Sequence, residues 1–421
     1  MAFASGALQR RQCSSAAACH RPRCSSSSRI AARFVRCAAS SSSSAAAAGS
    51  AAVATAEPAA WVKPGSQLEQ LAAMTVLSID TGDIQTIEKF AATGFITDAT
   101  TNPLFVSQAA ARGSEPEYAA MVDAAVTAAC AGYSNTAAGL PPAVPPHMPG
   151  SAPSAATIDL AIDCLSIELG KRILGIVQGY VSTEVDIRLS FDAAASEARA
   201  RRIIDLYEAA GVPRSRVLIK LAGTWEGVKA AEALEKDGIR CNITLVFGFC
   251  QAVAAAQAGA TLISPFPGRV LEWVKANGGP QAFSPAEDPG VVACRRMYAY
   301  FRKHGHATIC MPASWRSSTG NDLLDEVRAL AGTDRMTIPP PLLTQLAEDT
   351  SPLPRLLTPG AAGTAAECSD NGERLSEAAF RWELANDGAA NDKMAAGLRA
   401  FAGDTARLVE VLQAHPGWQK A

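Results

Sequence analysis

The segment RVLIKLAGTW, residues 216–225, opens with a nearly continuous apolar run that holds one lysine, Lys220. Apolar runs of about four to eight residues with β-branched side chains are typical of strands buried on both faces, as in a parallel sheet. A buried ammonium loses its hydration, so a lysine in such a strand has two interpretations. It either extends its amine into water along an apolar stem, or it serves a reaction that needs the amine there.

The reaction that suits a buried lysine is imine formation with a carbonyl compound. The amine must be unprotonated to attack, and desolvation or a neighbouring cation can lower a lysine pKa from about 10.4 toward roughly 7 to 8. What surrounds Lys220 therefore decides between the two interpretations.

Seven further segments share this apolar, β-branched character. They are TVLSID from Thr75, FITDAT from Phe95, ILGIVQGYV from Ile173, IRCNITLVF from Ile239, ATLISPF from Ala260, ATICMPAS from Ala307 and RMTIPP from Arg335. Most are separated by enough residues for a helix. Eight strands that alternate with helices predict an α/β fold, a single closed (β/α)8 (TIM) barrel with extra helices. An open doubly wound sheet is the alternative, but no GxGxxG turn follows the first strand.

Residues at helical spacing predict the helices between these strands. In residues 196–211, Ile203, Ile204 and Tyr207 lie on one face and a glycine ends the pattern. Residues 225–238 behave alike, and residues 392–413 predict a closing helix.

The chain begins with the composition of an organellar transit peptide. Residues 1–56 contain seven Arg and thirteen Ser but no Lys, Asp or Glu. The high Ser and Ala content favours the plastid stroma of a chloroplast, with the mitochondrion as the alternative. We therefore expect the barrel domain to occupy residues 57–421. Within it, GLPPAVPPHMPGSAPS, residues 139–154, predicts a proline-rich surface insertion, with a polyproline ligand as the alternative.

Charge and cysteine usage exclude several classes of protein. Without residues 1–56 the chain holds 31 Lys and Arg against 40 Asp and Glu, a balance that argues against general nucleic-acid binding. No apolar run approaches the about 18 residues that span a membrane. The seven Cys outside that segment form no CxxC pair, so neither a disulfide framework nor a zinc site is predicted. His304 and His306 resemble a metal-ligand pair, but they precede a strand and would lie at the barrel end away from the chemistry.

In barrels of this type the reacting groups lie at the carboxyl ends of the strands. The polar residues at those ends are Asp80, Asn102, Glu184, Lys220, Asn242, Thr244, Ser264 and Ser314. Each alone has an ordinary explanation, because turns and helix N-caps favour Asp, Asn and Ser. Asp98 is similarly either catalytic or a turn cap. Together, one interior lysine with two carboxylates, two amides and several hydroxyls is the set that imine chemistry needs.

Five segments, in order, resemble the transaldolase family of sugar-phosphate enzymes. They are DTGD at 80, TDATTNP at 97, STEVDIRLSFD at 182, LIKLAGTWEGVKAAEALEKDGIRCNITLVF at 218 and LISPFPGRVLEW at 262. The resemblance extends from about Thr75 to Leu412. It implies reversible transfer of a dihydroxyacetone unit through a lysine Schiff base in the non-oxidative pentose phosphate pathway. The donors would be sedoheptulose 7-phosphate or fructose 6-phosphate, and the acceptors glyceraldehyde 3-phosphate or erythrose 4-phosphate.

The resemblance also assigns the catalytic roles. Lys220 would form the imine, and Asp80 would take the proton of the substrate C4 hydroxyl. Glu184 would move protons during imine formation, through a water held with Thr244. The mechanism asks for no metal and no organic cofactor.

The remaining residues would bind substrate. Asn102 and Asn242 would hydrogen-bond the hydroxyls of the three-carbon unit, Ser264 its primary hydroxyl, and Phe266 would pack the cavity wall. Arg269, Ser314 and Arg316 would bind phosphate, for which the planar fork of arginine is suited. For Arg269, a surface ion pair with Glu272 is the alternative. The partners implied are sugar phosphates and, in the assembly, a second copy of the chain as a homodimer.

Two other functions remain open at this point. One is a lyase of the same barrel type that releases free dihydroxyacetone, which the chain length and the paired carboxylates of DTGD and STEVD disfavour. The other is a catalytically silent barrel that acts as a scaffold, which the presence of Lys220, Asp80 and Glu184 disfavours.

Overall fold

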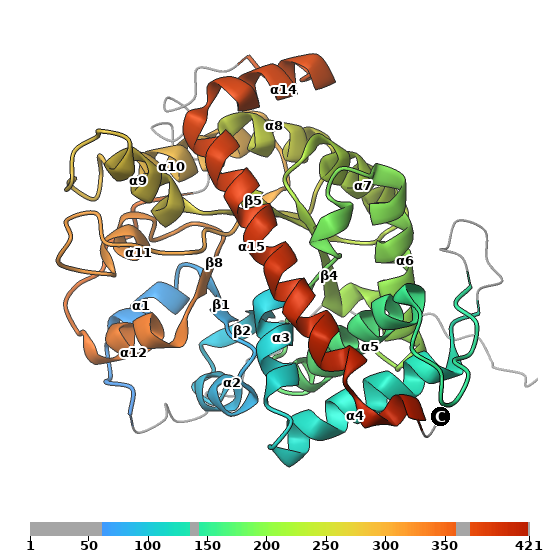
Figure 1. Cartoon of the computed structure of the whole chain (residues 1–421). Coiled ribbons are helices and arrows are strands. Elements are labelled where there is room, and N and C mark those ends of the chain that lie inside the picture. The colour runs from blue at the N-terminus through green and yellow to red at the C-terminus, as the bar shows by residue number, and fades with distance from the viewer. Residues whose placement is uncertain (1–60, 135–142, 359–370, 420–421) are drawn as a thin grey trace, which may run out of the picture. The chain divides into compact units, whose positions relative to one another are not determined.

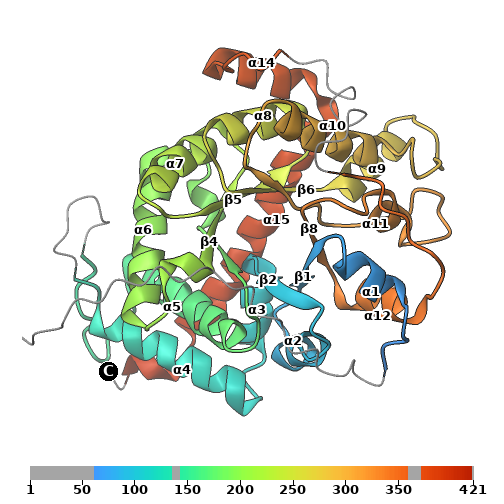
Figure 2. The same cartoon turned by 180° about the vertical axis from the view of Figure 1, so that it is seen from behind.

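The computed structural model describes residues 61–134, 143–358 and 371–419. Eight parallel strands in this part form one sheet in the order β7-β6-β5-β4-β3-β2-β1-β8. The strands are β1 Val76–Asp80, β2 Ile96–Thr100, β3 Val181–Glu184, β4 Val217–Ala222, β5 Cys241–Val246, β6 Leu262–Pro265, β7 Ile309–Cys310 and β8 Arg335–Ile338. The prediction of a (β/α)8 barrel is confirmed (Figures 1 and 2).

Helices surround this barrel, and extra helices precede β1, separate β2 from β3 and follow β8 (Figure 1). They are α1 Gln67–Ala72, α2 Ile84–Ala91, α3 Pro103–Ala111, α4 Pro116–Ala131, α5 Ala155–Leu174, α6 Ala193–Ala209, α7 Trp225–Lys236, α8 Phe249–Gln257, α9 Pro267–Ala276, α10 Pro289–Lys303, α11 Asp325–Ala329, α12 Pro340–Glu348, α14 Glu377–Asn386 and α15 Gly388–Gln413. The described part of the chain also contains three short 3-10 helices, η1 Ile187–Leu189, η2 Arg214–Arg216 and η3 Pro416–Gln419. No described helix is long and apolar enough to cross a membrane.

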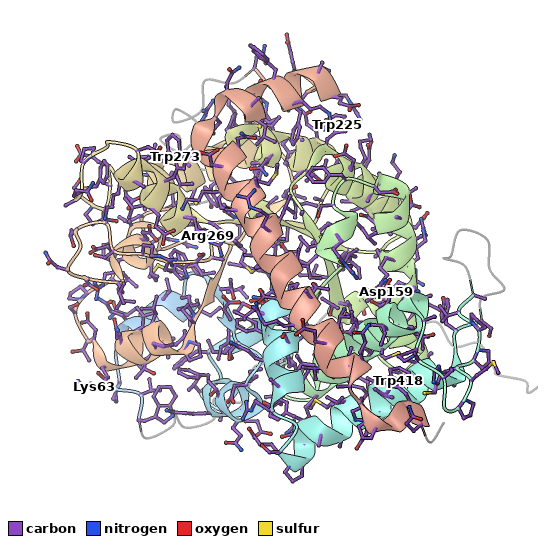
Figure 3. All side chains as sticks on the ribbon, in the orientation of Figure 1. Lys63, Asp159, Trp225, Arg269, Trp273 and Trp418 are labelled. Carbon is purple, nitrogen blue, oxygen red and sulfur yellow. The ribbon has the colours of Figure 1, made fainter. Side chains whose placement is uncertain are left out.

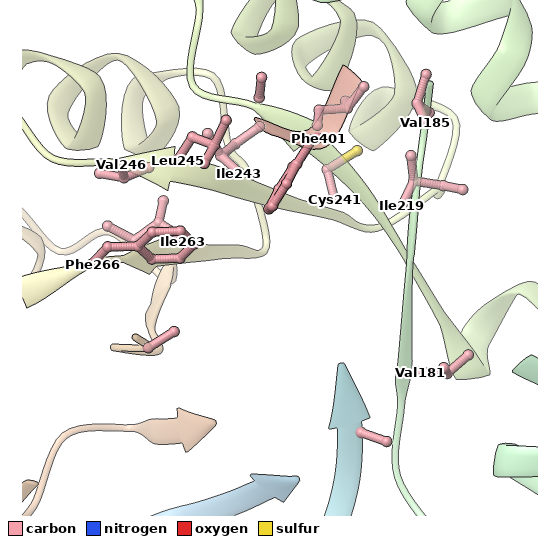
Figure 4. Packing of buried hydrophobic residues seen from close by; sticks show 14 of the residues in the cluster. Val181, Val185, Ile219, Cys241, Ile243, Leu245, Val246, Ile263, Phe266 and Phe401 are labelled. Atoms are coloured by element: carbon pink, nitrogen blue, oxygen red, sulfur yellow. The ribbon is translucent and has the colours of Figure 1, made fainter. Parts of the chain in front are cut away.

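The core lies in and around the barrel strands. Every residue of β4 and of β5 is buried, which is why these segments are nearly continuous in apolar residues. Figure 4 shows side chains of this core, among them Val181, Ile219, Ile243 and Ile263 from four neighbouring strands and Phe401 of α15. Each buried aliphatic side chain contributes roughly 1.5–3 kcal/mol to folding.

The barrel closes where β7 meets β8, and this seam is the least regular. β7 has two residues, and Pro312 just beyond it has no N–H to donate. The ladder to β6 nevertheless continues, because the Ala313 N–H donates to the Pro265 carbonyl at 2.9 Å. The Thr337 N–H of β8 donates to the Pro312 carbonyl at 3.2 Å and joins the two ends of the sheet.

Helix α15 crosses the mouth of the barrel, in front of the strands in Figure 1 and behind them in Figure 2. Gly397 allows this close approach, because a Cβ at that position would lie 2.7 Å from a terminal methyl of Leu245. Asp392 accepts a 2.8 Å hydrogen bond from the Trp273 indole of α9. The predicted closing helix is therefore present, and it covers the end of the barrel that holds Lys220.

One strand begins later in the chain than the sequence predicts. The third strand was expected from Ile173, but residues 173–174 end α5 and the strand begins at Val181. An apolar run alone cannot separate a buried helix end from the strand that follows it. The proline-rich insertion is described from residue 143 onward, where Val144 forms an isolated bridge with Tyr133 before α5 begins. The segment expected to be a transit peptide, residues 1–56, lies outside the described residues.

Candidate active site

Lys220 projects from β4 into the barrel and is 5% exposed. Its Nζ lies 3.0 Å from Oε2 of Glu184 on the neighbouring strand β3. Nζ also donates to the Thr101 carbonyl oxygen at 3.3 Å. The amine is thus buried and partnered inside the barrel, and the interpretation that it extends into bulk water is wrong.

Glu184 occupies an unusual environment for a carboxylate. Its side chain is 2% exposed, and burial raises the pKa of the carboxyl above its usual range, which Lys220 only partly offsets. Among the described residues, neither Oε1 of Glu184 nor Oγ1 of Thr244 has a hydrogen-bond partner. Burying polar atoms without hydrogen bonds costs folding free energy. A buried water that hydrogen-bonds both atoms commonly offsets this cost.

Asp80 ends β1 close to the same amine. Burial raises the pKa of this carboxyl, while a hydrogen bond from Thr100 and the charge of Lys220 act in the opposite direction. The Thr100 hydroxyl donates to Oδ1 at 2.8 Å and is itself 2.8 Å from the Thr337 hydroxyl of β8. These two threonines fix the position of the Asp80 carboxylate.

Hydrogen-bonded polar side chains from β3, β5 and β6 lie in the barrel interior. Oδ1 of Asn242 accepts from Ser264 at 2.8 Å, and its amide nitrogen donates to Ser182 at 3.2 Å. Asn242 is therefore fixed in orientation, with its oxygen toward β6. Asn102 is fixed differently, because its side-chain oxygen caps α3 by accepting the Phe105 N–H at 3.1 Å.

Two arginines face each other at the edge of the site. Arg269, labelled in Figure 3, stands in the first turn of α9, and its guanidinium lies 5.3 Å from the centre of the Phe266 ring. Burial and the nearby charge of Arg316 lower the pKa of Arg269. Glu272, the alternative partner of Arg269, instead accepts from Nε of Arg316 at 2.6 Å and from Lys393 at 3.3 Å. Within the described residues Arg269 has no ion pair, so an anion there would relieve the repulsion between the two guanidinium groups.

These residues surround one cavity of about 280 Å³ at the carboxyl ends of the strands. Eight of the predicted site residues line it: Asp80, Asn102, Lys220, Ser264, Phe266, Arg269, Ser314 and Arg316. The other three lie directly behind this lining. Glu184 contacts Lys220, Asn242 contacts Ser264, and Thr244 is fully buried on β5 beyond Asn242.

Several lining residues escaped the sequence analysis. Phe401 of α15 lies with its ring centre 5.9 Å from Nζ of Lys220. Thr100 and Thr337 also line the cavity, and Trp315 lines it while its indole N–H donates to the Thr337 carbonyl at 2.8 Å. Thr100 is the last residue of β2 and Thr337 the last but one of β8, so both share with Asp80 a position near the end of a strand. Nothing in a helical apolar stripe marks Phe401 as a residue of the site.

Two other candidates lie elsewhere. Asp98 is neither in the cavity nor in a turn, because it is buried within β2, where it accepts the Tyr180 N–H at 2.7 Å and pairs with Arg335 at the start of β8. His304 and His306 lie before β7 with their rings against Tyr300 of α10. In the part of the chain that the structure describes, no group of three or more His, Cys, Asp or Glu is arranged to hold a metal ion.

The chain is similar in sequence to known proteins over most of its length. The family model for transaldolase/fructose-6-phosphate aldolase matches residues 77–412. A transaldolase of Cellvibrio japonicus (strain Ueda107) is 45% identical over 349 residues, which cover 83% of this chain and 98% of the relative. A transaldolase of Haemophilus influenzae (strain PittGG) is 42% identical, with 83% of this chain and 99% of the relative covered. The matched regions cover nearly the full length of both relatives.

Proposed function

This chain belongs to the transaldolase/fructose-6-phosphate aldolase family, and from that premise we propose how its residues carry out the reaction. The activity is that of a transaldolase, a transferase of aldehyde and ketone residues. It moves a dihydroxyacetone unit reversibly from a ketose phosphate to an aldose phosphate. The assignment of steps to residues is our proposal.

Imine formation uses Lys220 and Glu184. The Lys220 amine attacks the C2 ketone carbon of the donor, and the resulting carbinolamine must lose its hydroxyl as water. Glu184 supplies the proton for that loss, because its carboxyl is 3.0 Å from the amine and its raised pKa favours the protonated form. A water between Glu184 and Thr244 would extend its reach and give both unpartnered oxygens a hydrogen bond.

Carbon–carbon cleavage uses Asp80. Its carboxylate takes the proton of the C4 hydroxyl, the C3–C4 bond breaks, and the electron pair of that bond moves into the protonated imine. An aldose phosphate leaves, and a three-carbon enamine stays covalently attached to Lys220. An acceptor aldose phosphate then reverses the same steps, with Asp80 returning the proton.

The three-carbon intermediate must survive until the acceptor arrives. Asn102, Asn242 and Ser264 support this by hydrogen-bonding its hydroxyls, while Phe266 packs against the cavity wall. Arg269, Arg316 and Ser314 bind the phosphate of either substrate at the edge of the cavity. The observation that carries the proposal is that one cavity joins the buried Lys220 amine, the Asp80 carboxylate and two arginines, of which Arg269 has no anionic partner among the residues that the structure describes.

Dependence on the acceptor tests the activity. Residues 57–421 are incubated with fructose 6-phosphate, and glyceraldehyde 3-phosphate formation is followed with and without erythrose 4-phosphate. Sustained turnover only with the acceptor is the expected result. Equal turnover without it would make the protein an aldolase, and no turnover in either case would leave a silent barrel.

We further propose a plastid location and a homodimer. The location rests on the composition of residues 1–56, and import of the full chain into isolated chloroplasts, but not mitochondria, with removal of that segment would test it. The homodimer rests on the family resemblance alone. Light scattering on the mature chain would give twice the chain mass if it is right.

A further inference from the structure

The segment after β7, residues 314–318, carries two of the phosphate-binding candidates, Ser314 and Arg316. Ser314 has a backbone φ of +65°, a conformation uncommon for residues other than glycine. Such a conformation persists when the surroundings hold it in place, so the contacts of this segment determine where Arg316 stands.

Three buried carboxyl groups accept hydrogen bonds from this segment. Oε2 of Glu326, in α11, accepts the Arg316 backbone N–H at 2.7 Å. Asp325 accepts the Ser317 hydroxyl at 3.0 Å, and Asp288 accepts the Ser318 hydroxyl at 2.7 Å. Glu326 is 0% exposed, and in the described part of the chain its other oxygen, Oε1, has no hydrogen-bond partner. No part of the proposed mechanism uses this residue.

Helix α9 also contacts this segment. A Cβ on Gly268 would lie 2.4 Å from the Ser314 carbonyl oxygen and 2.6 Å from Cγ of Arg316. Gly268 directly precedes Arg269, so the backbone of α9 touches the segment that carries the second arginine. Contacts with Gly268 and with Glu326 therefore both fix where Arg316 stands relative to Arg269.

The charge of Glu326 matters at this place. Burial raises the pKa of Glu326 to about 9, so at neutral pH the group is an uncharged acid. The groups that face it are Asp288, which raises the pKa, Arg316 and Lys275, which lower it, and the thiol of Cys294. An uncharged acid supports the Arg316 backbone without adding negative charge beside a phosphate.

We propose that Glu326 is a positioning residue for phosphate recognition, which holds Arg316 opposite Arg269 through its bond to the Arg316 backbone. The proposal rests on the proposed function, in which both arginines bind the substrate phosphate. Glu326 does not touch substrate, so its loss acts on substrate affinity and leaves the imine chemistry of Lys220 in place.

The test separates affinity from chemistry. Glu326→Ala should raise the KM for fructose 6-phosphate about tenfold, because it leaves a buried N–H unpaired and frees the segment. Borohydride trapping of dihydroxyacetone on the same variant, which needs no phosphate, should match the wild type. The matched control is Glu235→Ala. Glu235 is a partly buried carboxyl that also accepts backbone N–H groups, those of Cys241 and Thr261. It does not line the cavity, so the KM of the Glu235→Ala variant should stay unchanged.

A conservative variant tests the uncharged form and does not depend on the alanine variant folding. Glu326→Gln should keep the wild-type KM at about pH 7.5, whereas at about pH 10 the wild-type KM should rise severalfold above that of the glutamine variant. An unchanged KM in Glu326→Ala, or the same rise in Glu235→Ala, would overturn the proposal. So would identical pH profiles for wild type and Glu326→Gln. Failure of the proposed function itself would appear differently, as absence of any trapped adduct in the wild type.

Discussion

For single residues, the sequence predicts that the Lys220 amine is buried, but it does not predict that this amine contacts Glu184. One lysine in an apolar strand predicts a buried amine, and polar residues at strand ends predict what gathers around it. That Glu184 contacts the amine follows from the register of β3 against β4, which the sequence does not state. Arg269 illustrates the same limit. Its nearest acidic residue in the sequence, Glu272, pairs with Arg316 and Lys393 from distant segments.

Asp80 is the residue whose role is most separable from that of Lys220. Asp80→Asn should lower kcat on the order of a hundredfold to ten-thousandfold, because the C4 hydroxyl loses its base. Imine formation does not need that base, so borohydride should still trap intact six-carbon sugar phosphate on the variant. Steady-state rates and the mass of the adduct measure the two effects. A variant that keeps wild-type kcat would exclude Asp80 as the base.

The ionisation of Asp80 also predicts a pH dependence. Its pKa is raised by burial, and the base is active only when ionised, so kcat should fall with decreasing pH at a higher pH than for an ordinary carboxyl. Thr100→Val should move this fall to still higher pH, because it removes the hydrogen bond that lowers the pKa. Profiles of kcat against pH for the two proteins give the comparison, and coincident profiles would contradict it.

At the scale of elements, periodicity located the strands well where each is bounded by a turn. It failed at ILGIVQGYV, where the end of α5 and the start of β3 lie in one apolar run. It predicted α15 as a helix but could not tell that this helix lies across the barrel mouth, because the docking depends on distant residues such as Leu245 and Trp273. The contribution of Phe401 to the site therefore appears only in the structure.

Helix α15 should protect the covalent intermediate from water through Phe401. Phe401→Ala should increase release of glyceraldehyde 3-phosphate from fructose 6-phosphate without acceptor, relative to transfer with acceptor. The matched control is Phe380→Ala, which removes a buried aromatic of α14 that packs against Trp225 away from the cavity. Both variants should lose about 3–5 kcal/mol of stability. Only Phe401→Ala should raise the ratio of glyceraldehyde 3-phosphate release without acceptor to transfer with acceptor. An equal change in both would assign the effect to lost stability.

At the scale of the whole molecule, the sequence predicted the barrel because eight similar segments recur, and it predicted the end of the barrel that holds the chemistry. It could not predict the carboxyl groups that folding buries. Burial raises the pKa of Asp80, Glu184, Glu235, Glu326, Asp334 and Asp404. Each of these groups keeps its proton to a higher pH in the folded protein than in the unfolded chain, so its contribution to stability is present at low pH and is lost as pH rises.

Glu326 should show this linkage most clearly. Its pKa is about 9 in the folded protein and near 4.5 when unfolded, so between these values the folded state holds a proton that the unfolded state lacks. Stability should therefore fall by about 1.4 kcal/mol per pH unit across that window from this group alone. Glu326→Gln should remove this contribution, measured as free energies of urea unfolding at several pH values. Parallel pH profiles for wild type and variant would contradict it.

The central claim is that Lys220 holds the carbon fragment between two sugars, and covalent trapping tests it most directly. Residues 57–421 are treated with borohydride in the presence of fructose 6-phosphate and digested, and the modified peptide is identified by mass spectrometry. We expect a reduced three-carbon adduct on the peptide containing Lys220 and none in Lys220→Ala. An adduct that persists on another lysine in that variant, or no adduct in the wild type, would show that Lys220 does not hold the fragment.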